Sequence, residues 1–120
     1  MHKLYNYIEA KERLGTVTVK TKLIHSDVFS EESGNDVYIK PENLQITGSF
    51  KVRGAYNRIS KLTKEEKERG VIAASAGNHA QGVALAAQRL GIKAVIVMPK
   101  HTPLIKINAT KKYGAEVVLH

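Results

Sequence analysis

Residues 71–98, which read VIAASAGNHAQGVALAAQRLGIKAVIVM, decide the fold. Two short apolar runs, 71–74 and 94–98, enclose a longer segment at 78–90 that is followed by Gly91. Apolar runs without polar alternation are typical of strands buried on both faces. A glycine directly after a helical segment is typical of a helix end. The stretch therefore predicts a strand, a helix and a second strand of a parallel sheet.

The same alternation of apolar runs and helical segments continues towards the C-terminus. Thr102 and Pro103 predict a helix N-cap followed by proline at the first helical position, and we expect that helix to stop at Gly114. Residues 117–119 form a third apolar run. The expected fold class is α/β, with a parallel sheet that has helices on both faces.

On the N-terminal side, the apolar spacing around residues 52–59 predicts a helix. Its expected buried face consists of Val52, Ala55, Tyr56 and Ile59. Thr63 and Glu66 form a capping-box pattern that opens another short helix, which should stop at Gly70. Further back we expect a short strand at 37–39, irregular structure over 16–35 and an amphipathic helix over 4–13 whose apolar face is Leu4, Tyr7 and Ile8.

The composition limits the class of protein. The chain has 120 residues, enough for one ordinary domain, with 42% hydrophobic and 25% charged residues. No apolar run approaches the roughly 20 residues of a membrane helix, so we expect no membrane partner. Because there are no cysteines, disulfides and thiolate nucleophiles are excluded. The N-terminus lacks the apolar core of a secretory signal, and we expect a cytoplasmic location.

The net charge of +8 does not indicate a nucleic-acid partner. Residues 1–69 carry 13 basic and 10 acidic groups, whereas residues 70–120 carry six basic groups and only Glu116. The excess comes from missing acids rather than from a basic cluster. No alternation of aromatic and basic residues suggests base stacking. Small anionic ligands explain the balance better.

The segment 75–79 (SAGNH) is a candidate anion site. It follows a predicted strand and precedes a helix, which is where open α/β sheets bind ligands. The N–H groups at a helix N-terminus suit a carboxylate or phosphate, and Gly77 would let the backbone approach it closely. The alternative is an ordinary turn with Asn78 as the helix cap.

Lys51 is the second candidate, because it falls in the first turn of the predicted helix at 52–59. The helix dipole disfavours a cation there, and partial burial would act in the same direction. Both effects favour the neutral amine that an imine-forming lysine needs. Arg53 would strengthen these two effects if its positive charge lay near the Lys51 amine. The alternative is a solvated lysine beside a helix.

Other chemistries lack their motifs. Gly77 and Gly82 have P-loop spacing, but Val83 and Ala84 follow where lysine and serine or threonine are needed. No histidine pair has the spacing of a helical metal site, so we expect no metal. A Ser-His-Asp hydrolase would need a Gly-x-Ser-x-Gly elbow, which is missing.

Three segments together carry a family resemblance: KPENLQITGSFKVRGA (40–55), SAGNHAQG (75–82), and MP (98–99) with GAEVV (114–118). In order and spacing they resemble the N-terminal part of threonine dehydratases (threonine ammonia-lyases). These enzymes belong to the tryptophan-synthase-β-like, fold type II family that uses pyridoxal 5'-phosphate. The resemblance runs from about residue 20 to residue 120.

The resemblance implies roles for individual residues. Lys51 matches the lysine that holds the cofactor as an aldimine and acts in catalysis. Asn78 matches the residue that hydrogen-bonds the cofactor's ring hydroxyl, and Phe50 matches a residue beside the ring. Ser75, Gly77 and His79, together with Asn78, match the loop that receives the substrate carboxylate.

The resemblance also implies an activity and an architecture. The activity is pyridoxal-phosphate-dependent deamination of L-threonine, and also of L-serine, to 2-oxobutanoate or pyruvate and ammonia. Residues 1–53 would belong to a large cofactor domain and 54–120 to a small α/β domain. The phosphate-binding loop would lie beyond residue 120, so we expect a fragment that is inactive alone and a homo-oligomer in the full-length form. The alternatives are a serine racemase or serine dehydratase, or a non-catalytic fragment.

Overall fold

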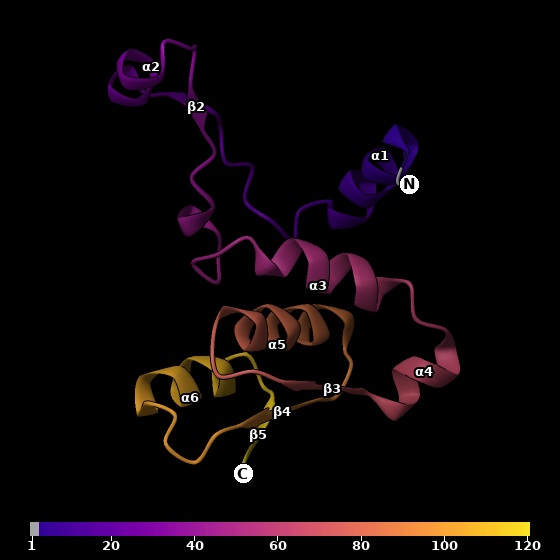
Figure 1. The fold of residues 1–120 in the computed structure, drawn as a ribbon. Helices are drawn as coiled ribbons and strands as arrows, with labels where there is room; N and C mark the ends of the chain where they lie inside the picture. Colours follow the sequence, from indigo (N-terminus) through magenta and orange to yellow (C-terminus); the bar gives the residue numbers. More distant parts are fainter. Residues whose placement is uncertain (1–2) are drawn as a thin grey trace.

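The computed structural model describes residues 3–120, which form an arm and a three-layered body (Figure 1). Its helices are α1 (Leu4–Leu14), α2 (Asp27–Ser33), the 3-10 turn η1 (Glu42–Leu44), α3 (Lys51–Ser60), α4 (Lys64–Arg69), α5 (Asn78–Leu90) and α6 (Leu104–Lys111). Its strands are β1 (Ile24–His25), β2 (Tyr38–Ile39), β3 (Val71–Ala74), β4 (Ala94–Met98) and β5 (Glu116–Leu119). No helix in this part of the chain has the length and apolar character needed to cross a membrane.

The body is built on a parallel sheet in the order β3-β4-β5, which confirms the α/β prediction. Val71 lies opposite Ala94, and Val95 lies opposite Glu116. Helix α5 connects β3 to β4, and α6 connects β4 to β5. Because both connections advance in the same direction along the sheet and such crossovers are right-handed, both helices lie on one face.

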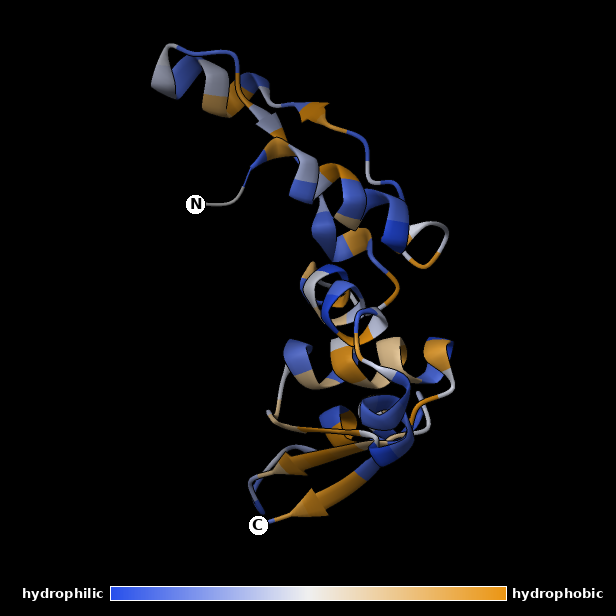
Figure 2. Ribbon diagram, turned by 90° about the vertical axis from the view of Figure 1, so that its right-hand side faces the viewer, coloured by the Kyte–Doolittle hydropathy of each residue, from blue (hydrophilic) through white to orange (hydrophobic). Residues whose placement is uncertain are grey.

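The burial of residues along the strands agrees with helices that cover one face of the sheet. In β4, Ala94, Ile96 and Met98 are buried beneath the helices, and the residues between them are half-buried. The opposite face carries Ile72 and Val118, which are exposed. Figure 2 shows the apolar strands at the lower edge of the molecule, with the helices above them. Of the predicted helices on both faces, residues 3–120 thus supply those of one face.

Helix α3 forms a second layer over α5 (Figure 1). The predicted face is present: Val52, Ala55 and Ile59 are buried, and Tyr56 is half-buried against the same core. The capping box at Thr63 is also confirmed, since its hydroxyl accepts the N–H of Glu66 and the Glu66 carboxylate accepts that of Thr63. Gly70 then ends α4, with a φ of 84°.

The arm consists of β1, α2 and β2. The strand predicted at 37–39 is confirmed as β2, whereas irregular structure was predicted for 16–35, which contains β1 and α2. Ile24 pairs antiparallel with Ile39, and none of the residues in α2 or the two strands is buried. The prediction was wrong because two local caps order this segment. Ser26 accepts the N–H of Phe29 at the start of α2, and Gly34 ends it in the left-handed conformation.

Two other details differ from the sequence predictions. Helix α1 forms, but its apolar residues Leu4, Tyr7 and Ile8 are exposed. It contacts α3 on another side, where Arg13 donates a hydrogen bond to Asn57. Helix α6 begins at Leu104 with Pro103 at the cap position, and the buried Thr102 hydroxyl makes no capping bond.

Candidate active site

Lys51 is the first residue of α3, as predicted. Its N–H points to the Ser49 hydroxyl at 3.4 Å, and its amine lies 4.8 Å from the centre of the Phe50 ring. Within residues 3–120 this amine has no ion-pair partner. The expected partial burial was wrong, because α5 covers the Val52 side of the helix and leaves Lys51 exposed.

Helix α5 reaches the backbone of Lys51 through Gly82. A Cβ placed on Gly82 would stand 3.0 Å from the Lys51 carbonyl carbon and 3.1 Å from the nitrogen of Val52. Asn78 lies one helical turn before Gly82, about 6 Å along the axis at 1.5 Å per residue. The first turn of α5 is therefore held beside the start of α3, so the backbone of Lys51 lies about one helical turn from the loop at 75–79.

That loop has the features of an anion-binding turn. Ser75 continues the strand pairing by donating its N–H to Val97, and its hydroxyl accepts the N–H of Gly77. Gly77, rather than Asn78, occupies the cap position of α5. A Cβ on Gly77 would meet nothing within 4 Å, so there is free space beside the backbone. The first turn of α5 has no acidic residue, and its N–H groups face that end of the helix.

The predicted loop residues do not all line one cavity. Ser75 lines a cavity of about 340 Å³ at the carboxyl ends of β3 and β4, together with Ala76 and Met98. His79 lines a separate apolar cavity of about 260 Å³ between α3, β3 and α5. Both Asn78 and His79 are exposed. The backbone of Lys51 thus lies near the start of α5, whereas Ser75 and His79 line two different cavities.

Arg53 was expected to add to the effect on Lys51 if it lay near, and the structure shows it paired. Instead of leaving a free charge near Lys51, its guanidinium binds the Glu42 carboxylate through two short hydrogen bonds, of 2.7 and 2.9 Å. This pairing lowers the pKa of Glu42 from 4.5 to about 2, with the hydrogen bond from Arg53 as the largest cause. Sequence patterns do not reveal the role of Glu42, since no periodicity relates two charges eleven positions apart, one in the turn η1 and one in α3.

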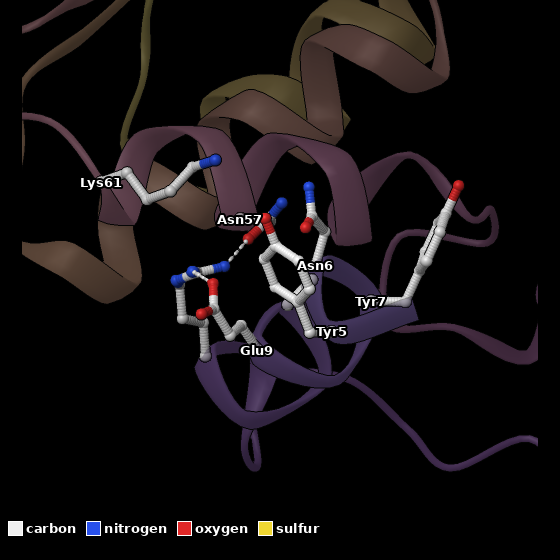
Figure 3. A pocket seen from close by; sticks show the side chains of 8 residues that line it. Tyr5, Asn6, Tyr7, Glu9, Asn57 and Lys61 are labelled. Atoms are coloured by element: carbon white, nitrogen blue, oxygen red, sulfur yellow. Dashed lines mark hydrogen bonds and ion pairs between the residues drawn. The ribbon is translucent and has the colours of Figure 1, made fainter. Parts of the chain in front are cut away.

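A further cavity and a cluster of polar residues around His25 lie away from Lys51. A cavity of about 340 Å³ between α1 and α3 is lined by Tyr5, Asn6, Glu9 and Lys61 among others (Figure 3), and includes no predicted site residue.

In the arm, His25 contacts both Asp27, at 2.9 Å, and the Ser30 hydroxyl, at 3.1 Å. That hydroxyl also accepts the N–H of Val37, which closes the hairpin. The contacts of this trio lie within the arm, and we assign it a structural role.

Comparison with known proteins identifies the class of protein to which this fold belongs. Residues 16–120 match the family model described as pyridoxal-phosphate dependent enzyme. The chain belongs to this family, which takes pyridoxal phosphate as its cofactor.

Individual relatives are more specific. The chain is 60% identical over 111 residues to an L-threonine ammonia-lyase of Thermotoga maritima, covering 92% of this chain and 28% of that enzyme. Among solved structures, threonine deaminase isoform 2 of Solanum lycopersicum matches at 44% identity with a TM-score of 0.82, covering 99% of this chain and 36% of that one. Serine racemase of Dictyostelium discoideum matches at 39% identity with a TM-score of 0.91, covering 98% and 38%. The chain thus spans about a third of the length of these relatives.

Proposed function

We propose that this chain supplies the reactive lysine and the substrate loop of a threonine ammonia-lyase, which converts L-threonine to 2-oxobutanoate and ammonia. L-Serine would give pyruvate. The observation that carries the proposal is the 60% identity to an enzyme of that name over 92% of the chain. The contact between Gly82 and Lys51 supports it, because it joins the two motifs that the reaction would use.

The residues present fit pyridoxal phosphate. The Lys51 amine is unpaired within residues 3–120 and would bind the aldehyde carbon of the cofactor. Asn78 stands at the start of α5 and would hydrogen-bond the ring hydroxyl, and the exposed Phe50 ring would lie beside the cofactor. When bound, the cofactor draws electrons from the Cα of the amino acid.

The protein's own residues would then orient the substrate and move protons. The Ser75 hydroxyl and the N–H groups of Gly77, Asn78 and His79 would bind the substrate carboxylate at the positive end of α5. Displaced by the substrate amine, the Lys51 amine would take the Cα proton. The β-hydroxyl would leave with a proton as water, and the resulting enamine would tautomerise to an imine that water hydrolyses to the 2-oxo acid and ammonia. Holding the Cα–H bond in line with the Lys51 nitrogen is the main contribution of such positioning.

The experiment uses the full-length polypeptide that carries residues 1–120, purified with pyridoxal phosphate. We expect an absorbance band from the lysine-bound cofactor and 2-oxobutanoate from threonine. A polypeptide that binds the cofactor but releases no 2-oxobutanoate from threonine would contradict the proposed reaction.

Serine racemase is the second candidate, favoured by the TM-score of 0.91 to the Dictyostelium enzyme. It predicts D-serine from L-serine, with slow turnover of threonine. A chiral assay of the product from L-serine, run beside the threonine assay, distinguishes the two activities.

We also propose that residues 1–53 belong to the large cofactor domain and 54–120 to the small α/β domain. The boundary would fall inside α3, so this helix would link the two. A cytoplasmic location and a homo-oligomeric full-length form complete the proposal. Cell fractionation and the solution mass of the full-length polypeptide test these two points.

A further inference from the structure

Glu42 and Arg53 form a closely fitted ion pair, and Arg53 lies two residues along α3 from Lys51. Arg53 donates from Nε to one carboxylate oxygen and from Nη2 to the other, so both oxygens are bound. The Glu42 side chain is 15% exposed, and that of Arg53 is 29% exposed. Two-point pairing of this kind fixes orientation as well as distance.

Additional donors hold the Glu42 carboxylate in place. The Thr21 hydroxyl donates to it at 2.7 Å, and the Gln45 amide donates at 3.3 Å. Gln45 is itself buried and binds the backbone of Val19 twice, accepting its N–H at 3.0 Å and donating to its carbonyl at 2.8 Å. Glu42 is therefore fixed from the segment at 19–21, from its own turn and from α3.

The ion pair also closes a ring in the chain. Glu42 and Arg53 are the two ends of the segment 42–53, and Lys51 lies inside it, two residues from the closing contact. The approach to Lys51 contains Gly48, whose φ is 69°, and includes no strand or α-helix before residue 51. Such a segment keeps much of its conformational freedom unless its ends are tied.

We propose that Glu42 is a positioning residue for Lys51: by binding Arg53 at two points it closes the segment 42–53 and aims the Lys51 amine at the loop 75–79. The inference rests on the proposed function. Gly82 fixes the backbone of Lys51 from the α5 side, and the ion pair fixes the segment that leads into it from the other side. Glu42 touches neither substrate nor cofactor in this role.

The test measures where pyridoxal phosphate reacts. The full-length polypeptide carrying Glu42→Gln is mixed with pyridoxal phosphate and trapped with borohydride, and the label is quantified by peptide mass spectrometry at Lys51 and at the exposed reference residue Lys112. Glutamine keeps the size of the side chain but turns an amide NH₂ towards the donors of Arg53 or Thr21. The matched control is Glu9→Gln, which makes the same change in an exposed glutamate–arginine pair on α1.

We expect Glu42→Gln to slow labelling at Lys51 about tenfold without changing labelling at Lys112, inside the range of about 100-fold that a 1 Å misplacement can cost. In the threonine assay, kcat should fall by a similar factor while KM changes less. Glu9→Gln should match the wild type in both measurements. Unchanged labelling of Lys51 in folded Glu42→Gln protein overturns the inference.

Thr21→Val is the second variant, because Glu42→Gln could unfold the segment. It removes one donor to Glu42 and keeps the ion pair, so we expect a smaller loss of about two- to threefold at Lys51, because a single neutral hydrogen bond contributes modestly. If Glu42→Gln is unfolded by circular dichroism, unchanged Lys51 labelling in Thr21→Val overturns the inference. If wild-type Lys51 is labelled no faster than Lys112, the proposed function itself fails.

Discussion

The backbone of Gly82 lies directly against the carbonyl group of Lys51, with no room for a Cβ between them. Because the neighbouring atoms are backbone, they cannot swing away as the end of a long side chain could. The relative position of α3 and α5 is thus set at the residue proposed to carry the reaction.

Gly82→Ala should therefore push α3 away from α5 by a few tenths of an ångström. We expect a loss of about 1–3 kcal/mol in the free energy of unfolding, typical of overpacking, together with slower cofactor labelling of Lys51. Gly54→Ala is the control: it lies in α3, and its Cβ would meet nothing within 4 Å. Alanine there should stabilise the helix by about 0.5–1 kcal/mol. Urea unfolding checks both values, and equal shifts for the two variants would show that the contact has no special role.

Lys51→Ala should separate function from stability. The side chain is exposed, so the free energy of unfolding should change by no more than about 0.5 kcal/mol. The borohydride-trapped adduct at this position and nearly all deamination should disappear. Lys112→Ala serves as the control and should keep both. A Lys51→Ala protein that retains wild-type deamination would refute the assignment of this lysine.

Ser75→Ala and Asn78→Ala should have different effects, because the two side chains have different proposed partners. Asn78→Ala should shift the cofactor absorbance band, since it removes a partner of the ring hydroxyl. Ser75→Ala should mainly raise the KM for threonine, and it also removes the hydrogen bond to the N–H of Gly77. Absorbance spectra and steady-state kinetics measure the two effects. Identical spectra and near-wild-type KM values in both variants would exclude these roles.

The stabilising effect of Glu42 should depend on acidity. The pKa of Glu42 is about 2 in the folded chain, below its ordinary value of 4.5. The ionised carboxylate therefore adds stability that is fully present above about pH 4.5 and is lost as the pH falls towards 2. The difference in unfolding free energy between wild type and Glu42→Gln should be constant from pH 7 to 5 and should shrink between pH 4.5 and 2. A difference that stays constant through this range in urea titrations would show that the ion pair does not stabilise the fold.

Local patterns in the sequence predicted most of the body. The apolar runs of β3 and β4, the capping box at Thr63 and the buried face of α3 all depend on neighbours within one or two turns. The two caps of α2 are equally local, but the short helix between them consists mostly of polar residues and was therefore not predicted. The apolar residues of α1 misled the prediction because the contacts of α1 are set by Arg13 and Asn57, on different helices.

The candidate site also combines local features that the sequence predicts with contacts between distant segments that it does not. Lys51 and the loop at 75–79 could be found in the sequence, because each sits at a helix start with a distinctive set of residue types. The pairing of Glu42 with Arg53 and the approach of Gly82 to Lys51 join distant segments, and only the folded chain reveals them. The exposure of Lys51 likewise depends on which side of α3 meets α5.

The arm formed by β1, α2 and β2 has a consequence for how this sequence can change over generations. Because none of the residues in these three elements is buried, most substitutions there alter no packed interior and escape the usual penalty on stability. Its hairpin depends on a few polar contacts, such as those of His25 and Ser30. We therefore expect the arm to tolerate substitutions with smaller changes in the free energy of unfolding of this chain than the packed body does.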